Sequence, residues 1–143
     1  MRQVAVFDTN VLLSGVGWKG KPFQCLELAR VGTVEGVICQ EIVDELTEKL
    51  QHKLSLSLED INETLADLLS FMSLVTITRQ LQVIVADPDD DQVLECAVVG
   101  HATHIVSGDK KHLLPLGTYQ GIRIVSPAEF LQLVANAGNQ PAP

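Results

Sequence analysis

The chain has 143 residues, of which 46% are hydrophobic and 20% are charged. This size and composition predict a single globular domain, and they exclude a large multidomain assembly and an acidic disordered chain. The 10 Lys and Arg residues against 18 Asp and Glu residues give a net charge of −8. A generic basic nucleic-acid-binding protein is disfavoured, because the chain would repel a polyanion at long range.

Cysteine usage and hydropathy indicate the compartment. Cys25, Cys39 and Cys96 are odd in number and widely spaced, which favours reduced, buried thiols over a disulfide framework or a thiolate zinc site. The N-terminal segment reaches Asp8 before a signal-peptide stretch develops, and no run approaches the roughly 18 apolar residues of a membrane span. We therefore expect a soluble, cytoplasmic protein without membrane contact.

The first half of the chain reads as strands and helices in alternation. Val4 to Phe7 is an unbroken apolar run, which predicts a strand buried on both faces at the centre of a parallel sheet. The next helix begins at Pro22 and should end near Gly32. The elements expected after it are a strand over 34–39, a helix over 40–54, a helix over 58–72 and a strand over 74–78.

The second half continues the alternation after an extended apolar run over 83–86. A helix over 89–100 should be capped by Asp89, with Gln92 as its capping-box partner. Strands are expected at 105–106 and 122–125, and a last helix over 127–135 has Ser126 as its N-cap. The pattern predicts a three-layer α/β/α fold with a mainly parallel central sheet, forming one domain over 1–137 with a flexible tail over 138–143.

Acidic residues follow the predicted strands. In open α/β sheets function sits beyond the carboxyl ends of the strands, where this chain has Asp8, Glu41 and Glu45, Asp109, and the run from Asp87 to Asp91. Two carboxylates about 4 Å apart repel by roughly 4 kcal/mol at an effective dielectric constant near 20. Acids that converge at one sheet edge therefore need a cation, or must partly protonate.

The position of each acid around its helix narrows the set of candidate metal ligands. Asp90 precedes Val93, Leu94 and Ala97 by three, four and seven residues, so it points toward the core. Asp91 is in line with Glu95, which we expect to be exposed, and ranks second. Glu45 lies closer than Glu41 to the apolar stripe of its helix. Oxygen ligands of this kind suit Mg²⁺ or Mn²⁺, whereas zinc prefers nitrogen and sulfur.

An ordered set of short motifs resembles the PIN-domain family, and most of all its bacterial branch of toxin components of toxin-antitoxin pairs. The resemblance extends from about residue 4 to residue 133. The motifs are Phe7-Asp8-Thr9-Asn10, Glu45-Leu46, Asp87-Pro88-Asp89-Asp90 with Leu94-Glu95-Cys96-Ala97, Val106-Ser107-Gly108-Asp109, and the segment from Ile124 to Leu131.

The resemblance implies a metal-dependent ribonuclease in which three or four acids hold one or two Mg²⁺ or Mn²⁺ ions. Carried over by motif, these acids are Asp8, Glu45, Asp90 and Asp109, with Asp87 or Asp91 as a substitute for Asp90. Ser107 would help to orient ligands or water, and Thr9 and Asn10 would support the first acid. The implied partners are an RNA substrate, a cognate antitoxin protein and a second copy of the chain in a homodimer.

Two other functions are compatible with acids at strand ends. A receiver-like, Mg²⁺-binding signalling module would need adjacent acids after its first strand, but Thr9 and Asn10 follow Asp8. A catalytically weak PIN-like domain that only binds partners would keep the same acids. Further candidates, for contacts to an RNA backbone rather than for the metal site, are Trp18, Lys19, Lys21, Lys110, Lys111 and His112.

Overall fold

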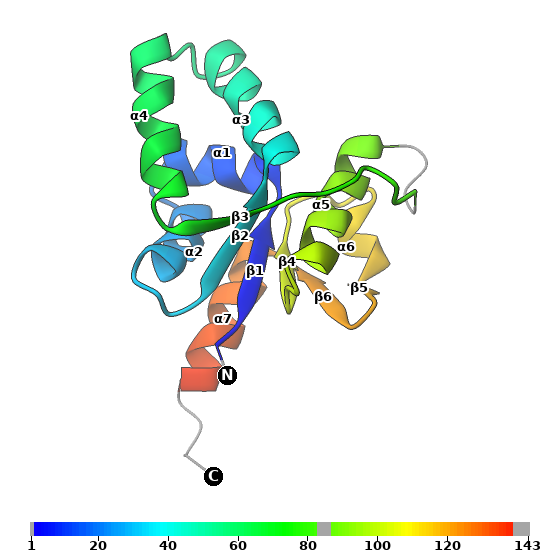
Figure 1. Cartoon of the computed structure of the whole chain (residues 1–143). Helices are drawn as coiled ribbons and strands as arrows, with labels where there is room; N and C mark the ends of the chain where they lie inside the picture. The colour runs from blue at the N-terminus through cyan, green and yellow to red at the C-terminus, as the bar shows by residue number, and fades with distance from the viewer. Residues whose placement is uncertain (1, 83–86, 139–143) are drawn as a thin grey trace.

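The computed structural model describes residues 2–82 and 87–138. The run over 83–86 and residues 139–143 of the predicted tail lie outside the described residues. The elements are β1 (Val4–Phe7), α1 (Thr9–Gly17), α2 (Lys21–Arg30), β2 (Glu35–Cys39), α3 (Gln40–His52), α4 (Leu58–Leu69), β3 (Met72–Val75), α5 (Pro88–Val99), β4 (His104–Val106), α6 (Leu113–Leu116), β5 (Thr118–Tyr119), β6 (Ile122–Val125) and α7 (Pro127–Gly138) (Figure 1).

The strands form one sheet in the order β3-β2-β1-β4-β6-β5. All neighbours are parallel except β5 and β6, which pair antiparallel. In the centre of the sheet Val6 of β1 lies opposite Val37 of β2 and Ile105 of β4. Ala5 and Val6 are 0% exposed, as expected for the strand predicted to be central.

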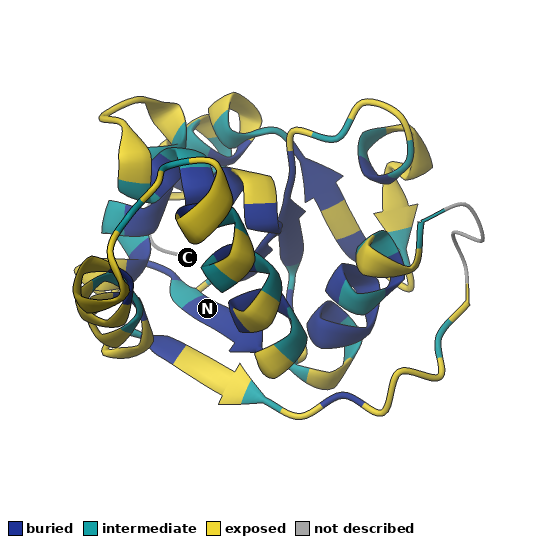
Figure 2. Cartoon of the chain, turned by 90° about the horizontal axis from the view of Figure 1, so that it is seen from above, coloured by how far each residue is buried: buried dark blue, intermediate teal, exposed yellow. Residues whose placement is uncertain are grey.

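Helices cover both faces of the sheet. α5 packs against β1, β2 and β4, and it lies on the opposite face from α2 and α7 (Figure 1). The helices show buried turns toward the sheet and exposed turns toward the outside, whereas β1 is buried (Figure 2). The predicted three-layer α/β/α architecture is therefore confirmed. No helix in the described part of the chain is long and apolar enough to cross a lipid bilayer.

Helix starts follow from capping side chains. Asp8 accepts a hydrogen bond from the N–H of Val11 at 2.8 Å and caps α1. Ser126 accepts from the N–H of Glu129 at 3.2 Å, and the Glu129 carboxylate accepts from the N–H of Ser126 at 3.3 Å. This reciprocal pair is a capping box, and it starts α7 where the sequence predicted.

Several predicted boundaries were wrong. The strand predicted over 74–78 is β3, Met72–Val75, and the helix predicted over 58–72 ends at Leu69. Met72 belongs to the strand because it pairs with Gly36 of β2, whose missing side chain leaves room for the Met72 sulfur. The cap of α5 is Asp87, which accepts from the N–H of Asp89 at 3.1 Å, and not Asp89. Pro88 occupies the first turn, where its missing N–H costs nothing.

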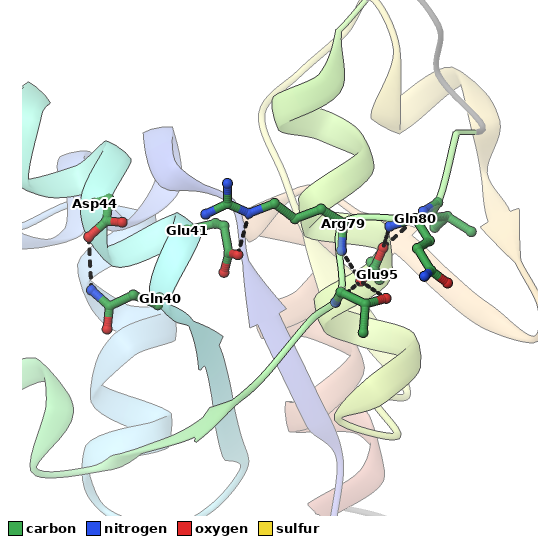
Figure 3. A network of polar contacts seen from close by, with 8 residues as sticks. Gln40, Glu41, Asp44, Arg79, Gln80 and Glu95 are labelled. Carbon is green, nitrogen blue, oxygen red and sulfur yellow. Dashed lines mark hydrogen bonds and ion pairs between the residues drawn. The ribbon is translucent and has the colours of Figure 1, made fainter.

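Glu95 was predicted to be exposed, but it is only 8% exposed. Its carboxylate accepts hydrogen bonds from four consecutive N–H groups, at residues 78–81, over 2.6–2.9 Å. The side chain of one of these residues, Arg79, reaches Glu41 of α3 at 2.7 Å (Figure 3). The segment after β3 is therefore attached to α5 through Glu95 and to α3 through Arg79.

Candidate metal centre

Four acids from four separate segments line one cavity of about 870 Å³. Asp8 directly follows β1, and Asp109 lies three residues after β4. Glu45 is in the second turn of α3, and Asp90 is in the first turn of α5. The structure thus brings together the four residues that the sequence singled out, and Asn10 lines the same cavity.

Asp8 is buried, with 6% of its surface exposed. One carboxylate oxygen caps α1, and the other accepts a hydrogen bond from the hydroxyl of Ser107. The Ser107 oxygen accepts in turn from the N–H of Asp109 at 2.9 Å. Ser107 therefore joins two of the acids without lining the cavity itself. Burial raises the pKa of Asp8 above its ordinary value, and the charge of Asp109 adds to this effect.

Asp90 and Asp109 face each other and titrate as a pair. Burial is the main cause that raises the pKa of Asp90 to about 8, followed by its hydrogen bond to Asp109 and the charge of Asp87. Burial also opposes ionisation of Asp109, but the N–H groups of Lys111 and Leu113, at 3.0 and 3.1 Å, hold its pKa below the ordinary value. The two shifts therefore favour a protonated Asp90 beside an ionised Asp109.

Glu45 lies on the α3 side of the cavity. Its carboxylate accepts a hydrogen bond from the Thr9 hydroxyl at 3.0 Å and pairs with the Lys49 ammonium at 3.1 Å. Lys49 also donates to the amide oxygen of Asn10 at 2.8 Å. Burial is the main cause that raises the pKa of Asp89, and the charge of the nearby Glu45 raises it further. Asp89, expected to be a helix cap, is thus a further acid at this cavity.

The sequence model of a family described as PIN domain matches residues 4–111. The chain belongs to the PIN domain family. The matched segment contains all four acids, and it leaves the receiver-like alternative without support. The fold is also similar to that of a crystal structure described as VapBC2 from Rickettsia felis bound to a DNA fragment from their promoter. That likeness has a TM-score of 0.62 and 14% identity, and it covers 85% of this chain and 97% of the other. Among curated proteins none matches the sequence.

The donor set of this PIN domain suits a divalent cation. Carboxylate oxygens and the amide oxygen of Asn10 are ligands that Mg²⁺ and Mn²⁺ accept. Burial is the main cause of the raised pKa values of Asp8 and Asp90, and neighbouring carboxylates add repulsion: Asp109 for Asp8, and Asp87 and Asp109 for Asp90. A bound dication would relieve this repulsion, so the residues present fit the ion that the family resemblance implies.

The structure separates the two substitutes considered for Asp90. Asp87 lines the same cavity as Asp90. Asp91 lines a different cavity of about 300 Å³, beside Glu95 and Arg79. Asp91 is therefore too far around the helix to replace Asp90, whereas Asp87 is placed to act with it.

Sequence reasoning missed several residues at the cavity of this PIN domain. Lys49 stands four residues after Glu45, and this helical spacing could have predicted the ion pair. The contact between Thr9 and Glu45 joins residues 36 positions apart, and no local pattern reports it. The other residues with charged or titratable side chains that line the cavity are Glu48, His52, Lys53, Asp87, Asp89, Lys110 and Lys111.

Proposed function

We propose that this PIN domain is a cytoplasmic metal-dependent endoribonuclease, which hydrolyses RNA phosphodiester bonds with Mg²⁺ or Mn²⁺. The observation that carries the proposal is the convergence of Asp8, Glu45, Asp90 and Asp109 on one cavity at the carboxyl edge of the sheet. Such a group of carboxylates repels a phosphate unless a cation lies between them. Membership of the PIN domain family supports the same chemistry.

The four acids would hold the ion, and their neighbours would hold the acids. Ser107 orients Asp8 toward Asp109, and Thr9 fixes the carboxylate of Glu45. Asn10 supports this side of the cavity through Lys49. A bound divalent ion would supply positive charge to the phosphate and lower the pKa of the attacking water. The chain itself thus provides a set of ligands whose positions are fixed before an ion arrives.

Cations at the cavity reconcile an acidic chain with an anionic substrate. Lys110 and Lys111 follow Asp109, and His52 and Lys53 lie at the end of α3; all four line the cavity. Phosphates on either side of the cleaved bond could contact these side chains, whereas the net charge of −8 repels RNA at long range. Binding should therefore be local, metal-supported and sensitive to salt.

The proposal includes a role as the toxin of a toxin-antitoxin pair, with an antitoxin protein as partner. The motif resemblance to the bacterial toxin branch supports it, and so does the fold likeness to VapBC2. Expression of the wild-type chain in a bacterial host should then slow growth, and Asp8→Asn should restore it. Equal growth with both proteins, at equal soluble yield, would contradict the toxin role.

Cleavage of a labelled single-stranded RNA by purified protein tests the nuclease. Activity with Mn²⁺ or Mg²⁺ should disappear with EDTA and in Asp8→Asn and Asp109→Asn. Asp60→Asn is a matched control, because Asp60 is an exposed carboxyl in the first turn of α4. If the protein binds metal but cleaves no RNA, the nuclease is refuted and a domain that only binds partners is favoured.

A further inference from the structure

A histidine stands beside two of the acids. Nδ1 of His112 lies 3.1 Å from an oxygen of Asp90 and 3.8 Å from an oxygen of Asp109. Asp87, Asp90 and His112 each offer one ligand atom, and these three atoms all lie within 4.8 Å of one another. His112 comes from the N-cap of α6, whereas both aspartates start α5. Two elements that are separate in the sequence therefore contribute to one cluster.

The separations in this cluster match those between ligands of a single ion. Ligands about 2.1 Å from an octahedral ion lie about 3.0 Å apart when adjacent and about 4.2 Å apart when opposite. The 3.1 Å between Nδ1 of His112 and the Asp90 oxygen is close to the separation of adjacent ligands, and the 3.8 Å to Asp109 lies between the two values. Asp87 uses one oxygen to cap α5, and a carboxylate keeps a second oxygen for an ion.

The donor types differ from those of an all-carboxylate site. Mg²⁺ takes oxygen ligands and loses its water reluctantly, whereas imidazole nitrogen is a common ligand of first-row transition ions. We propose that His112 is a nitrogen ligand of the ion at this cavity, and that it makes the site select Mn²⁺ over Mg²⁺. The inference rests on the proposed function, because it concerns the ion that the nuclease would use.

The hydrogen bond between His112 and Asp90 suggests how the site changes when metal is absent. Nδ1 of His112 and a carboxyl oxygen of Asp90 lie within hydrogen-bond distance, at 3.1 Å. An ion bound by both atoms would replace this hydrogen bond, so the same contact holds the two ligands together before metal arrives. A purely structural His112 would need only this hydrogen bond.

Pulsed electron paramagnetic resonance of Mn²⁺ bound to the protein without RNA separates the two roles. We expect a coupling from a directly bound ¹⁴N nucleus, which changes when the wild-type chain carries ¹⁵N-histidine. His112→Gln keeps a donor for Asp90 and offers an amide oxygen, but it should abolish the coupling. Calorimetry should show an affinity for Mn²⁺ reduced about 10- to 100-fold, with a much smaller change for Mg²⁺.

His52→Gln is the control, because His52 lines the cavity but is not part of the cluster of Asp87, Asp90 and His112; it should leave the nitrogen coupling in place. Bound Mn²⁺ without a nitrogen coupling in the wild-type chain overturns the inference and leaves the nuclease proposal standing. A coupling that disappears in His52→Gln and persists in His112→Gln also overturns it. A coupling from His112 in a protein that cleaves no RNA supports the inference and refutes the nuclease.

Discussion

Three of the four candidate acids are held by particular hydrogen-bond donors. The Ser107 hydroxyl holds Asp8, the Thr9 hydroxyl holds Glu45, and two backbone N–H groups hold Asp109. These bonds limit the rotamers that the carboxylates adopt and keep them facing one another despite their repulsion. The resulting preorganisation is what a divalent ion requires of its ligands and of the groups around them.

Asp8→Asn should separate activity from stability. An amide oxygen can still accept from the N–H of Val11 and cap α1, because Asn and Asp are equivalent caps. Its loss of charge removes the cost of burying an ionised carboxylate, which is the main cause of the raised pKa of Asp8, and the smaller repulsion by Asp109. We expect cleavage to fall at least about 100-fold with an equal or higher Tm. A variant that unfolds at lower temperature would instead show that the ionised carboxylate stabilises the fold.

The raised pKa of Asp90 predicts how the stability of the metal-free protein changes with pH. The folded chain holds a proton on Asp90 between the ordinary value of 3.8 and about 8, whereas the unfolded chain releases it. Stability contributed by this group therefore falls as pH rises through that window. In EDTA, Asp90→Asn should raise the Tm little at about pH 5 and more at about pH 8. A difference in Tm between the two proteins that does not change with pH would contradict a proton held on Asp90 in the folded chain.

At the residue scale the sequence predicted positions better than contacts. The phase of Asp90 relative to Leu94 and Ala97 placed it on the inner side of α5, and it lines the cavity. The same reasoning predicted wrongly that Glu95 is exposed, because an acid in a helix usually faces water. The four N–H groups that make its burial favourable lie 14 to 17 residues earlier, and no helical pattern reports them.

At the scale of elements, Glu95 and Arg79 determine how two helices are joined. The segment after β3 contacts α5 through Glu95 and α3 through Arg79 and Glu41 (Figure 3). These helices carry Asp90 and Glu45, which form opposite parts of the cavity. The backbone of Arg79 has a positive φ of 63°, so its conformation depends on these surrounding bonds.

Glu95→Gln should destabilise the protein by about 1.5–3 kcal/mol, because an amide offers one acceptor oxygen and turns its own N–H₂ toward a donor. Burial alone would raise the pKa of Glu95, but the four N–H groups lower it below 4.5. The ionised carboxylate of Glu95 therefore stabilises the fold above pH 4.5, and this contribution disappears as pH falls through the lowered pKa.

Urea denaturation at neutral pH measures this effect. Glu59→Gln in the first turn of α4 is the control, since Glu59 is exposed; a surface change of this kind usually alters stability by no more than about 0.5 kcal/mol. Equal midpoints for Glu95→Gln and the control would show that the segment after β3 needs no charged anchor.

Most long elements were predicted, but the nine-residue helix α1 was not among those expected, and the shortest elements were missed. The helix that begins at Gln40 and the strand over 122–125 start where apolar spacing and turn residues predicted. β5 has two residues and α6 has four, which is too short for any periodicity. The end of α4 was misplaced because Phe71 and Met72 continue its apolar pattern, although their backbone belongs to the turn and to β3.

On the scale of the whole molecule, the sheet order could be predicted only in part. An unbroken apolar run predicted a buried central strand, and β1 occupies that place between β2 and β4. The antiparallel pairing of β5 with β6 depends on a hairpin at Gln120 and Gly121, both with positive φ. The extent of the domain over 1–137 stays a prediction, and so does metal binding by the four acids.

The homodimer implied by the family resemblance is a prediction for the whole molecule. Light scattering after size exclusion should give the mass of two chains of 15.5 kDa over a broad concentration range. Large apolar side chains are available at the surface for such contact, among them Trp18, Val31, Leu58 and Leu74. A mass of one chain at every concentration would contradict the dimer.

The sheet joins the start of the chain to a strand made much later. The N–H of Val4 donates to the hydroxyl of Thr103, 99 residues away, and Asp8 reaches Ser107 over the same separation. A ribosome that has made residues 1–90 holds three of the four acids without β4, so the nascent chain has no complete cavity. Any nuclease activity would therefore require residue 109 to have left the exit tunnel.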